Sequence, residues 1–173
     1  MSLCAFFFLL ASCSGNMDDI NRFDRQSPPD QEVVGAHIRR SSRAMLEMEL
    51  DAPRIVKYSK PAAKTLYPKG VTVRFYDNKG AIKTYLFASK AVSFDDRNIM
   101  QASDSVVVID YGTGDTIYLK DIVWRSDEDI IFSNKPVRAV NGRRVTYGDG
   151  FVSDEQMTNL RVTHQRGVIE FQE

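Results

Sequence analysis

Apolar and polar side chains alternate in short runs over most of this chain, from Val33 onward. The clearest run is VTVRFY at 71–76, in which Val, Val and Phe alternate with Thr, Arg and Tyr. A period of two places alternate side chains on opposite faces of a β-strand. Turn sequences separate the runs, among them DNKG (77–80), YGTGD (111–115) and NGRR (141–144). The pattern predicts an all-β domain of about a dozen strands and no helix.

The stretch from Ala44 to Leu50 is ambiguous. Its residue types, which are mainly Ala, Met, Leu and Glu, favour a helix. The strict alternation of apolar residues with Glu47 and Glu49, and the presence of Pro53 just beyond, favour a strand. We predict a strand here.

The run SVVVI at 105–109 differs from the others because it is apolar at consecutive positions. Such a run is typical of a strand that is covered on both faces. We therefore expect it to lie in the centre of the sheet with both faces buried.

One phrase recurs along the chain. LDAPRIVKY (50–58) and LFASKAVSF (86–94) match so that Leu50 and Leu86, and likewise Val56 and Val92, are 36 positions apart. TIYLKDIVW (116–124) repeats the phrase in shortened form, with Ile122 in the place of Val92. Recurrence of this length indicates one hairpin unit stacked on copies of itself. A stacked roll buries a continuous apolar seam and, unlike a closed barrel, leaves strand edges free.

The first residues follow a different pattern. MSLCAFFFLLASCSG (1–15) is apolar, too short to span a bilayer and ends in small residues, which is typical of a secretory signal. Its Leu-Ala-Ser-Cys at 10–13 looks like the lipobox of bacterial lipoproteins; the alternative is an ordinary signal peptide whose cleavage site contains Cys. We expect a lipoprotein signal peptide at 1–12, a lipidated Cys13 with a flexible tether over 13–32, and a β-domain over 33–173.

Composition narrows the classes of function. Lys plus Arg and Asp plus Glu both total 23, so the net charge is zero and no basic surface for nucleic acid is indicated. The two cysteines, Cys4 and Cys13, both lie in the N-terminal segment, so no disulfide is expected in the exported domain. Hydrophobic residues make up 43% of the chain, which suits one domain held by an apolar core.

No group of residues indicates an active site or a metal site. His37 and His164 are far apart and have no cysteine or histidine at ligand spacing. The acidic clusters at 95–97 and 126–129 fall at predicted turns, where carboxylates are usually solvated and not paired for glycoside hydrolysis. We expect a protein that is not an enzyme and uses no cofactor or metal. The arginine pairs at 39–40 and 143–144 could contact lipid phosphates or could be solvated charges that protect a sheet edge.

Several pieces in a fixed order resemble the LptC family of periplasmic lipopolysaccharide-export proteins. The pieces are GAIKTYLFASKAVSF, VVV, GD, IVW, IFSNKPV and YGDGFVSD. The early unit APRIVKY and the lipoprotein start look like the form found in Bacteroides-type bacteria. The resemblance extends from about Val33 to Phe171, which is nearly all of the expected mature chain.

The resemblance implies an open, boat-like β-jellyroll in the periplasm, anchored at the inner membrane. Lipopolysaccharide would pass through it from an ABC transporter to a periplasmic bridge protein. The N-terminal edge would pair with the transporter and the C-terminal edge with the bridge protein. Two glycines of the family correspond to Gly80 and Gly148. Many relatives have a transmembrane anchor, whereas this chain has Cys13 in the lipobox.

A lipid with several acyl chains needs an apolar trough that is open along one side, because its sugars stay outside. The candidates for the trough wall are the inward members of the alternating runs: Val73, Phe75, Leu86, Ala88, Val106, Val108, Leu119, Val145 and Tyr147. The alternative is that these side chains form only a core. Two other classes also remain open, a closed lipocalin-like lipid carrier and a glycan-binding surface lipoprotein, which would expose aromatic residues on loops.

Overall fold

The computed structural model describes residues 28–60, 63–94 and 96–170, and this part of the chain is all-β, as predicted. The alternating runs form twelve strands within the described residues. Their bounds are β1 Gln31–Ser42, β2 Met45–Tyr58, β3 Lys64–Tyr67, β4 Val71–Tyr76, β5 Ile82–Ala88, β6 Lys90–Phe94, β7 Ile99–Asp110, β8 Asp115–Arg125, β9 Ile130–Ser133, β10 Val137–Asn141, β11 Arg144–Asp154 and β12 Arg161–Glu170.

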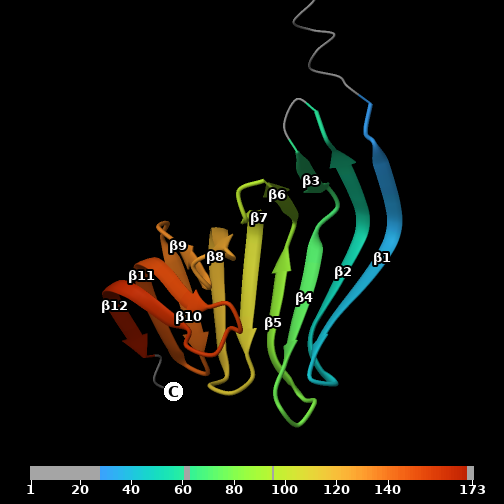
Figure 1. Ribbon diagram of the computed structural model, residues 1–173. Coiled ribbons are helices and arrows are strands. Elements are labelled where there is room, and N and C mark those ends of the chain that lie inside the picture. Colours follow the sequence, from blue (N-terminus) through green and yellow to red (C-terminus); the bar gives the residue numbers. More distant parts are fainter. Residues whose placement is uncertain (1–27, 61–62, 95, 171–173) are drawn as a thin grey trace, which may run out of the picture.

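All twelve strands belong to one antiparallel sheet. In places two short strands lie end to end beside one long strand: β4 and β3 both pair with β2, and β10 and β9 both pair with β8. β1 pairs with β2 and β12 pairs with β11, so these two strands are the ends of the sheet. Figure 1 shows the sheet curling between them, with β1 and β12 on opposite sides of the view. The fold is therefore an open β-jellyroll-like roll.

A line of irregular positions bends the sheet. β7 contains a bulge at Asp104 and Ser105, which have left-handed φ angles of 57° and 62°. Beside it, β5 and β6 are separated at Ser89, whose N–H donates to the carbonyl oxygen of Asp104 at 3.0 Å. Gly70 follows β3 and lies so close to β5 that an added Cβ would be 2.9 Å from the Ala88 carbonyl oxygen. Because a bulge kinks its strand, this line turns one face of the sheet inward.

The inward face carries the apolar core. In β4 the buried residues Val71, Val73 and Phe75 alternate with half-buried ones, as predicted. β7 is central, between β5 and β8, but the prediction that both of its faces are buried is wrong. Val106 and Val108 are fully buried, whereas the residues between and after them are only half-buried. The physical reason is that the described chain is one curled sheet, so only its inward face packs on itself.

The first two copies of the repeated phrase occupy equivalent places. Leu50 of β2 and Leu86 of β5 both pair with Val73 of β4. In the same way, Val56 of β2 and Val92 of β6 both pair with Leu66 of β3. The spacing of 36 residues thus corresponds to two long paths that flank β4 and β3.

The third copy is out of step by one residue. Ile122 of β8 pairs with Ala102 of β7, and Ala102 pairs with Ala91 and not with Val92. A shift of one residue moves a side chain to the other face of a sheet. Ile122 is therefore buried, whereas Val92 is only half-buried.

β1 and β2 form a long hairpin. β2 confirms the strand predicted over the ambiguous stretch, although it begins at Met45. Arg43 and Ala44 make the turn with φ angles of 50° and 62°, the pattern of a type I′ turn. β1 begins at Gln31, two residues before the predicted start of the domain at Val33.

Candidate functional site

An apolar cavity lies inside the roll. Its volume is about 60 Å³, and the residues around it come from both halves of the sheet and from the segment after β11. They are Arg40, Met48, Leu50, Val71, Val73, Phe75, Leu86, Met100, Ala102, Ile122, Trp124, Ile131 and Glu155. Arg40 and Glu155 are the charged members of this set.

The predicted trough residues separate into three groups. Val73, Phe75 and Leu86 line the cavity. Four others are buried in the core but do not line it: Ala88, Val106, Val108 and Leu119. Val145 and Tyr147 are the exceptions, and their prediction as inward residues is wrong. Val145 is buried but lies outside the core, and 38% of the surface of Tyr147 is exposed.

The error at Tyr147 comes from glycine. In the β10–β11 ladder Tyr147 pairs with the exposed Arg138, whereas Gly148 pairs with the buried Val137. The inward position in this part of β11 is thus Gly148, which has no side chain to mark it in the sequence. Val145 lies on the same side of the ladder as Tyr147, although its own side chain is buried.

An ion pair stands beside the cavity. Arg40 Nη1 on β1 donates to Oε1 of Glu155 at 2.7 Å, which joins residues 115 positions apart. Arg40 Nε also lies 3.6 Å from Oε2 of Glu47, an ion-pair contact but not a hydrogen bond. From the sequence, Arg40 could contact lipid phosphates or protect a sheet edge, and no sequence signal connected it with Glu155.

The segment from Glu155 to Leu160 carries that carboxylate across the roll. It follows β11, and in Figure 1 the chain between β11 and β12 extends towards the middle of the molecule. Met157 is buried in the core, and its carbonyl oxygen accepts a hydrogen bond from Thr84 Oγ1 of β5 at 3.3 Å. Thr158 Oγ1 accepts from Lys83 Nζ at 2.8 Å. We call residues 155–160 the strap, because they connect the C-terminal part of the sheet to β5 and β1.

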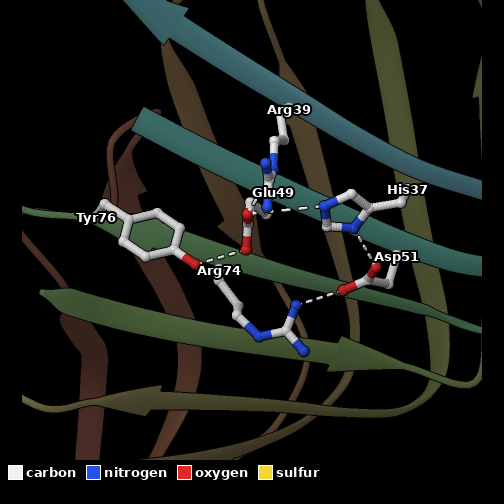
Figure 2. Close-up of polar contacts among 6 residues, drawn as sticks. All are labelled: His37, Arg39, Glu49, Asp51, Arg74 and Tyr76. Atoms are coloured by element: carbon white, nitrogen blue, oxygen red, sulfur yellow. Dashed lines mark hydrogen bonds and ion pairs between the residues drawn. The ribbon is translucent and has the colours of Figure 1, made fainter. Parts of the chain in front are cut away.

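A second polar cluster lies on β1, β2 and β4 (Figure 2). Its members are His37, Arg39, Glu49, Asp51, Arg74 and Tyr76. On β2, Glu49 and Asp51 alternate with the inward residues Leu50 and Ala52. The cluster therefore lies on the outward face of the sheet. We call it the outer clasp, since it joins the edge strand β1 to its neighbour β2 and to the next strand, β4.

Glu49 and Asp51 are the centres of the outer clasp. Glu49 accepts hydrogen bonds from Tyr76 Oη at 2.6 Å and from Arg39 Nε at 2.8 Å. Asp51 is bonded to His37 Nδ1 at 2.6 Å and accepts a hydrogen bond from Arg74. The hydrogen bond from Tyr76, followed by the contacts of Arg39, holds the pKa of Glu49 below its ordinary value. The bonds of His37 and Arg74 likewise lower the pKa of Asp51.

The chemistry of the outer clasp is that of a structural network. Every carboxylate oxygen named above already has an arginine, histidine or tyrosine partner, and no serine, threonine or cysteine is among the members of the clasp. His37 is exposed on β1. Its pairing with Asp51 follows from the hairpin register, which places these two residues opposite each other.

The two glycines singled out by the family resemblance have different surroundings. Gly80 ends the DNKG turn with a left-handed φ of 78° and has open space around it. Gly148 lies where β12 approaches β11 closely. An added Cβ there would be 2.6 Å from the Thr163 carbonyl oxygen and closer still to Val162 Cγ1. Gly80 thus serves a turn, and Gly148 a close approach of strands.

The remaining predicted features are placed as follows. Cys13, the signal peptide and most of the tether lie outside the described residues. His164 is on β12, far along the sheet from His37 on β1. Within the described ranges, no group of His, Cys, Asp and Glu is arranged to hold a metal ion. The same ranges contain no helix long and apolar enough to cross a membrane.

The fold and the interior define a class of protein, an open antiparallel roll with an apolar inside. No model of a known protein family matches the sequence, and no curated protein matches it either.

Proposed function

We propose that this chain is a lipopolysaccharide-transport protein of the LptC type, lipid-anchored in the periplasm at the inner membrane. The observation that carries the proposal is the pair of free sheet edges on a roll with an apolar interior. β1 and β12 each have one pairing partner in the described chain. Both expose aliphatic side chains, Val34 and Ile38 on β1 and Val168 and Ile169 on β12.

Free edges support the proposed partners. An edge strand has unpaired N–H and C=O groups, which another chain can continue by β-augmentation. In this proposal the ABC transporter continues the sheet at β1, and the periplasmic bridge protein continues it at β12. The two partners then stand at opposite ends of one continuous apolar interior.

The interior supports lipid handling only if the roll opens. A cavity of about 60 Å³ is far smaller than one that holds a single benzene molecule, about 150 Å³. Acyl chains therefore need the two halves of the sheet to separate. Residues of the core that do not line the cavity, such as Val106 and Val108, would join its wall on opening.

In-cell photo-crosslinking tests the proposal. A photo-reactive residue at Phe75 or Leu86, both on the cavity wall, should capture lipopolysaccharide when the transporter is active. The matched control is Tyr147, an aromatic residue on the outward face. Glu47 is a poorer control, because it lies beside Arg40 at the cavity. Capture of lipopolysaccharide at Tyr147 as strong as that at Phe75 would contradict an internal path.

The sequence left two alternative functions open, a lipocalin-like carrier and a glycan-binding lipoprotein. A closed lipocalin-like barrel does not fit, since β1 and β12 remain ends of the sheet. Glycan binding has one observation in its favour, the exposed pair Tyr118 and Tyr147 on either side of Arg138. These residues stand on strands, not on loops. Retention of the protein on immobilised glycans, and its loss in Tyr118→Ala, would favour that function.

A further inference from the structure

Two buried N–H groups beside the apolar cavity have no hydrogen-bond partner. They are Trp124 Nε1 and Arg40 Nε, and both residues line the cavity. Among the described residues only one other buried side-chain atom is unpaired in this way, Ser153 Oγ. Buried donors without an acceptor are unusual and unfavourable. The surface of the cavity itself is apolar, so the oxygen atoms of a ligand with an apolar body would reach these donors only when the wall of the cavity moves.

The cation at this site is already engaged by the protein itself. Glu155 of the strap holds the Arg40 guanidinium at 2.7 Å, and its side chain is mostly buried, with 16% exposed. A carboxylate or phosphate on a ligand would bind the same guanidinium with the same geometry. The ligand's anionic group and Glu155 therefore compete for one partner.

The strap that carries Glu155 has few attachments across the roll. Besides the ion pair, the described residues show the exposed Lys83–Thr158 bond, the 3.3 Å bond from Thr84 to the Met157 carbonyl, the buried Met157 side chain and the half-buried Leu160, which packs against the core. Met157 also has a left-handed φ of 54°, which is unfavourable for a residue with a side chain. Segments with few such contacts open at low free-energy cost compared with core strands.

We propose that the strap is a gate, and that an anionic acyl amphiphile opens it by displacing Glu155 from Arg40. The anionic group binds Arg40, the acyl chain enters the cavity beside Trp124 and Phe75, and withdrawal of Met157 enlarges the apolar space. Met157 is placed to act in this way, because Thr84, which bonds its carbonyl, pairs with Phe75 on the cavity wall. The inference rests on the proposed lipid-handling function and names the residues that control entry.

Trp124 supplies the measurement, because it is the single tryptophan of the sequence. The full chain is titrated with a brominated dodecanoate, whose bromine quenches tryptophan fluorescence on contact. Saturable quenching is expected. A brominated dodecanol, which has the chain without the charge, should bind more weakly, and inorganic phosphate, which has the charge without the chain, should not quench.

Two variants test the gate. Glu155→Gln removes the competing carboxylate, so dodecanoate should bind about two- to fivefold more tightly, the range of a partly exposed ion pair, while dodecanol binding changes little. Glu32→Gln is the matched control, since it breaks the exposed Glu32–Arg54 pair on β1 and β2, away from the cavity. Arg40→Gln should abolish the preference for dodecanoate over dodecanol. This second variant tests the gate independently if Glu155→Gln does not fold.

The outcomes separate the gate from the proposed function. The gate is wrong if Glu155→Gln and Glu32→Gln bind dodecanoate equally, or if Arg40→Gln keeps the preference for the anion. In either case, quenching of Trp124 would still place acyl chains inside the roll. If no acyl ligand quenches Trp124 in folded protein, this site is wrong. The photo-crosslinking at Phe75 and Leu86 then decides the transport function separately.

Discussion

At the scale of single residues, the fold joins charges that the chain keeps far apart. Arg40 and Glu155 meet beside the apolar cavity, and Glu49 and Asp51 are surrounded by partners from three strands. Both carboxylates of the outer clasp are held in the charged form by hydrogen bonds, so each contributes to stability only while it is ionised. We therefore expect the attachment of the edge strand β1 to depend on pH.

The sign of that dependence follows from the lowered pKa values. A carboxyl group whose pKa is lower in the folded protein stabilises the fold above its ordinary pKa, which is 4.5 for Glu49 and 3.8 for Asp51. That contribution is lost as the pH falls through the lower folded values. We expect the free energy of unfolding to fall on acidification, and to fall less steeply in Glu49→Gln and Asp51→Asn.

Urea unfolding at a series of pH values between about 3 and 7 measures this effect. Asp127→Asn, at an exposed turn position, controls for the change in net charge. A pH dependence of Glu49→Gln identical to that of the unchanged protein would show that the outer clasp does not hold β1.

At the scale of elements, strand contacts depend on small residues where backbones approach. Gly148 leaves room for β12 against β11, and Gly70 leaves room for β5 at the bend. Neither requirement is visible as an apolar pattern. For the same reason the inward face of β11 is not visible in the sequence, and the prediction of Tyr147 as an inward residue is wrong.

We expect Gly148→Ala to destabilise the protein by about 1–3 kcal/mol, because the added Cβ overlaps the Thr163 carbonyl oxygen and the Val162 side chain. The matched control is Gly167→Ala on β12, where nothing lies within 4 Å of the added Cβ. Thermal or urea unfolding compares the two variants. Equal stability would mean that β12 moves aside without cost.

At the scale of the whole molecule, the sheet has two ends and therefore a direction. The proposed function assigns the transporter to β1 and the bridge protein to β12. Edge pairing can be blocked by proline, which lacks the N–H donor and distorts the strand. Val34 and Val168 are suited to this test, since both are exposed on their edge strands, 77% and 44% respectively.

We expect Val168→Pro to lose the bridge protein while keeping the transporter, and Val34→Pro to do the reverse. Pull-downs from cell membranes measure both partners at once, and the fluorescence maximum of Trp124 checks that each variant is folded. The opposite result for the two variants would reverse the direction of the roll. Retention of both partners by both variants would show that these edges are not interfaces.

The sequence by itself determined the secondary structure and much of the core. Alternation and the turn sequences between the runs predicted most of the strands. The inward assignment of Val73, Phe75 and Leu86 is correct, because each stands in a regular strand. The repeat was also visible, since strands that flank a common neighbour need similar residues at similar spacing.

Only the tertiary structure decided the rest. Arg43, Ala44 and Asp104 have left-handed φ angles, although glycine and asparagine are the residues that usually indicate this conformation. The first hairpin turn and the bulge of β7 were therefore not predicted from the sequence. The pairing of Arg40 with Glu155 depends on how far the sheet curls, which is the sum of many small twists and bulges. Local patterns determine which face of a strand is apolar, but the curl of the whole sheet determines which distant groups meet.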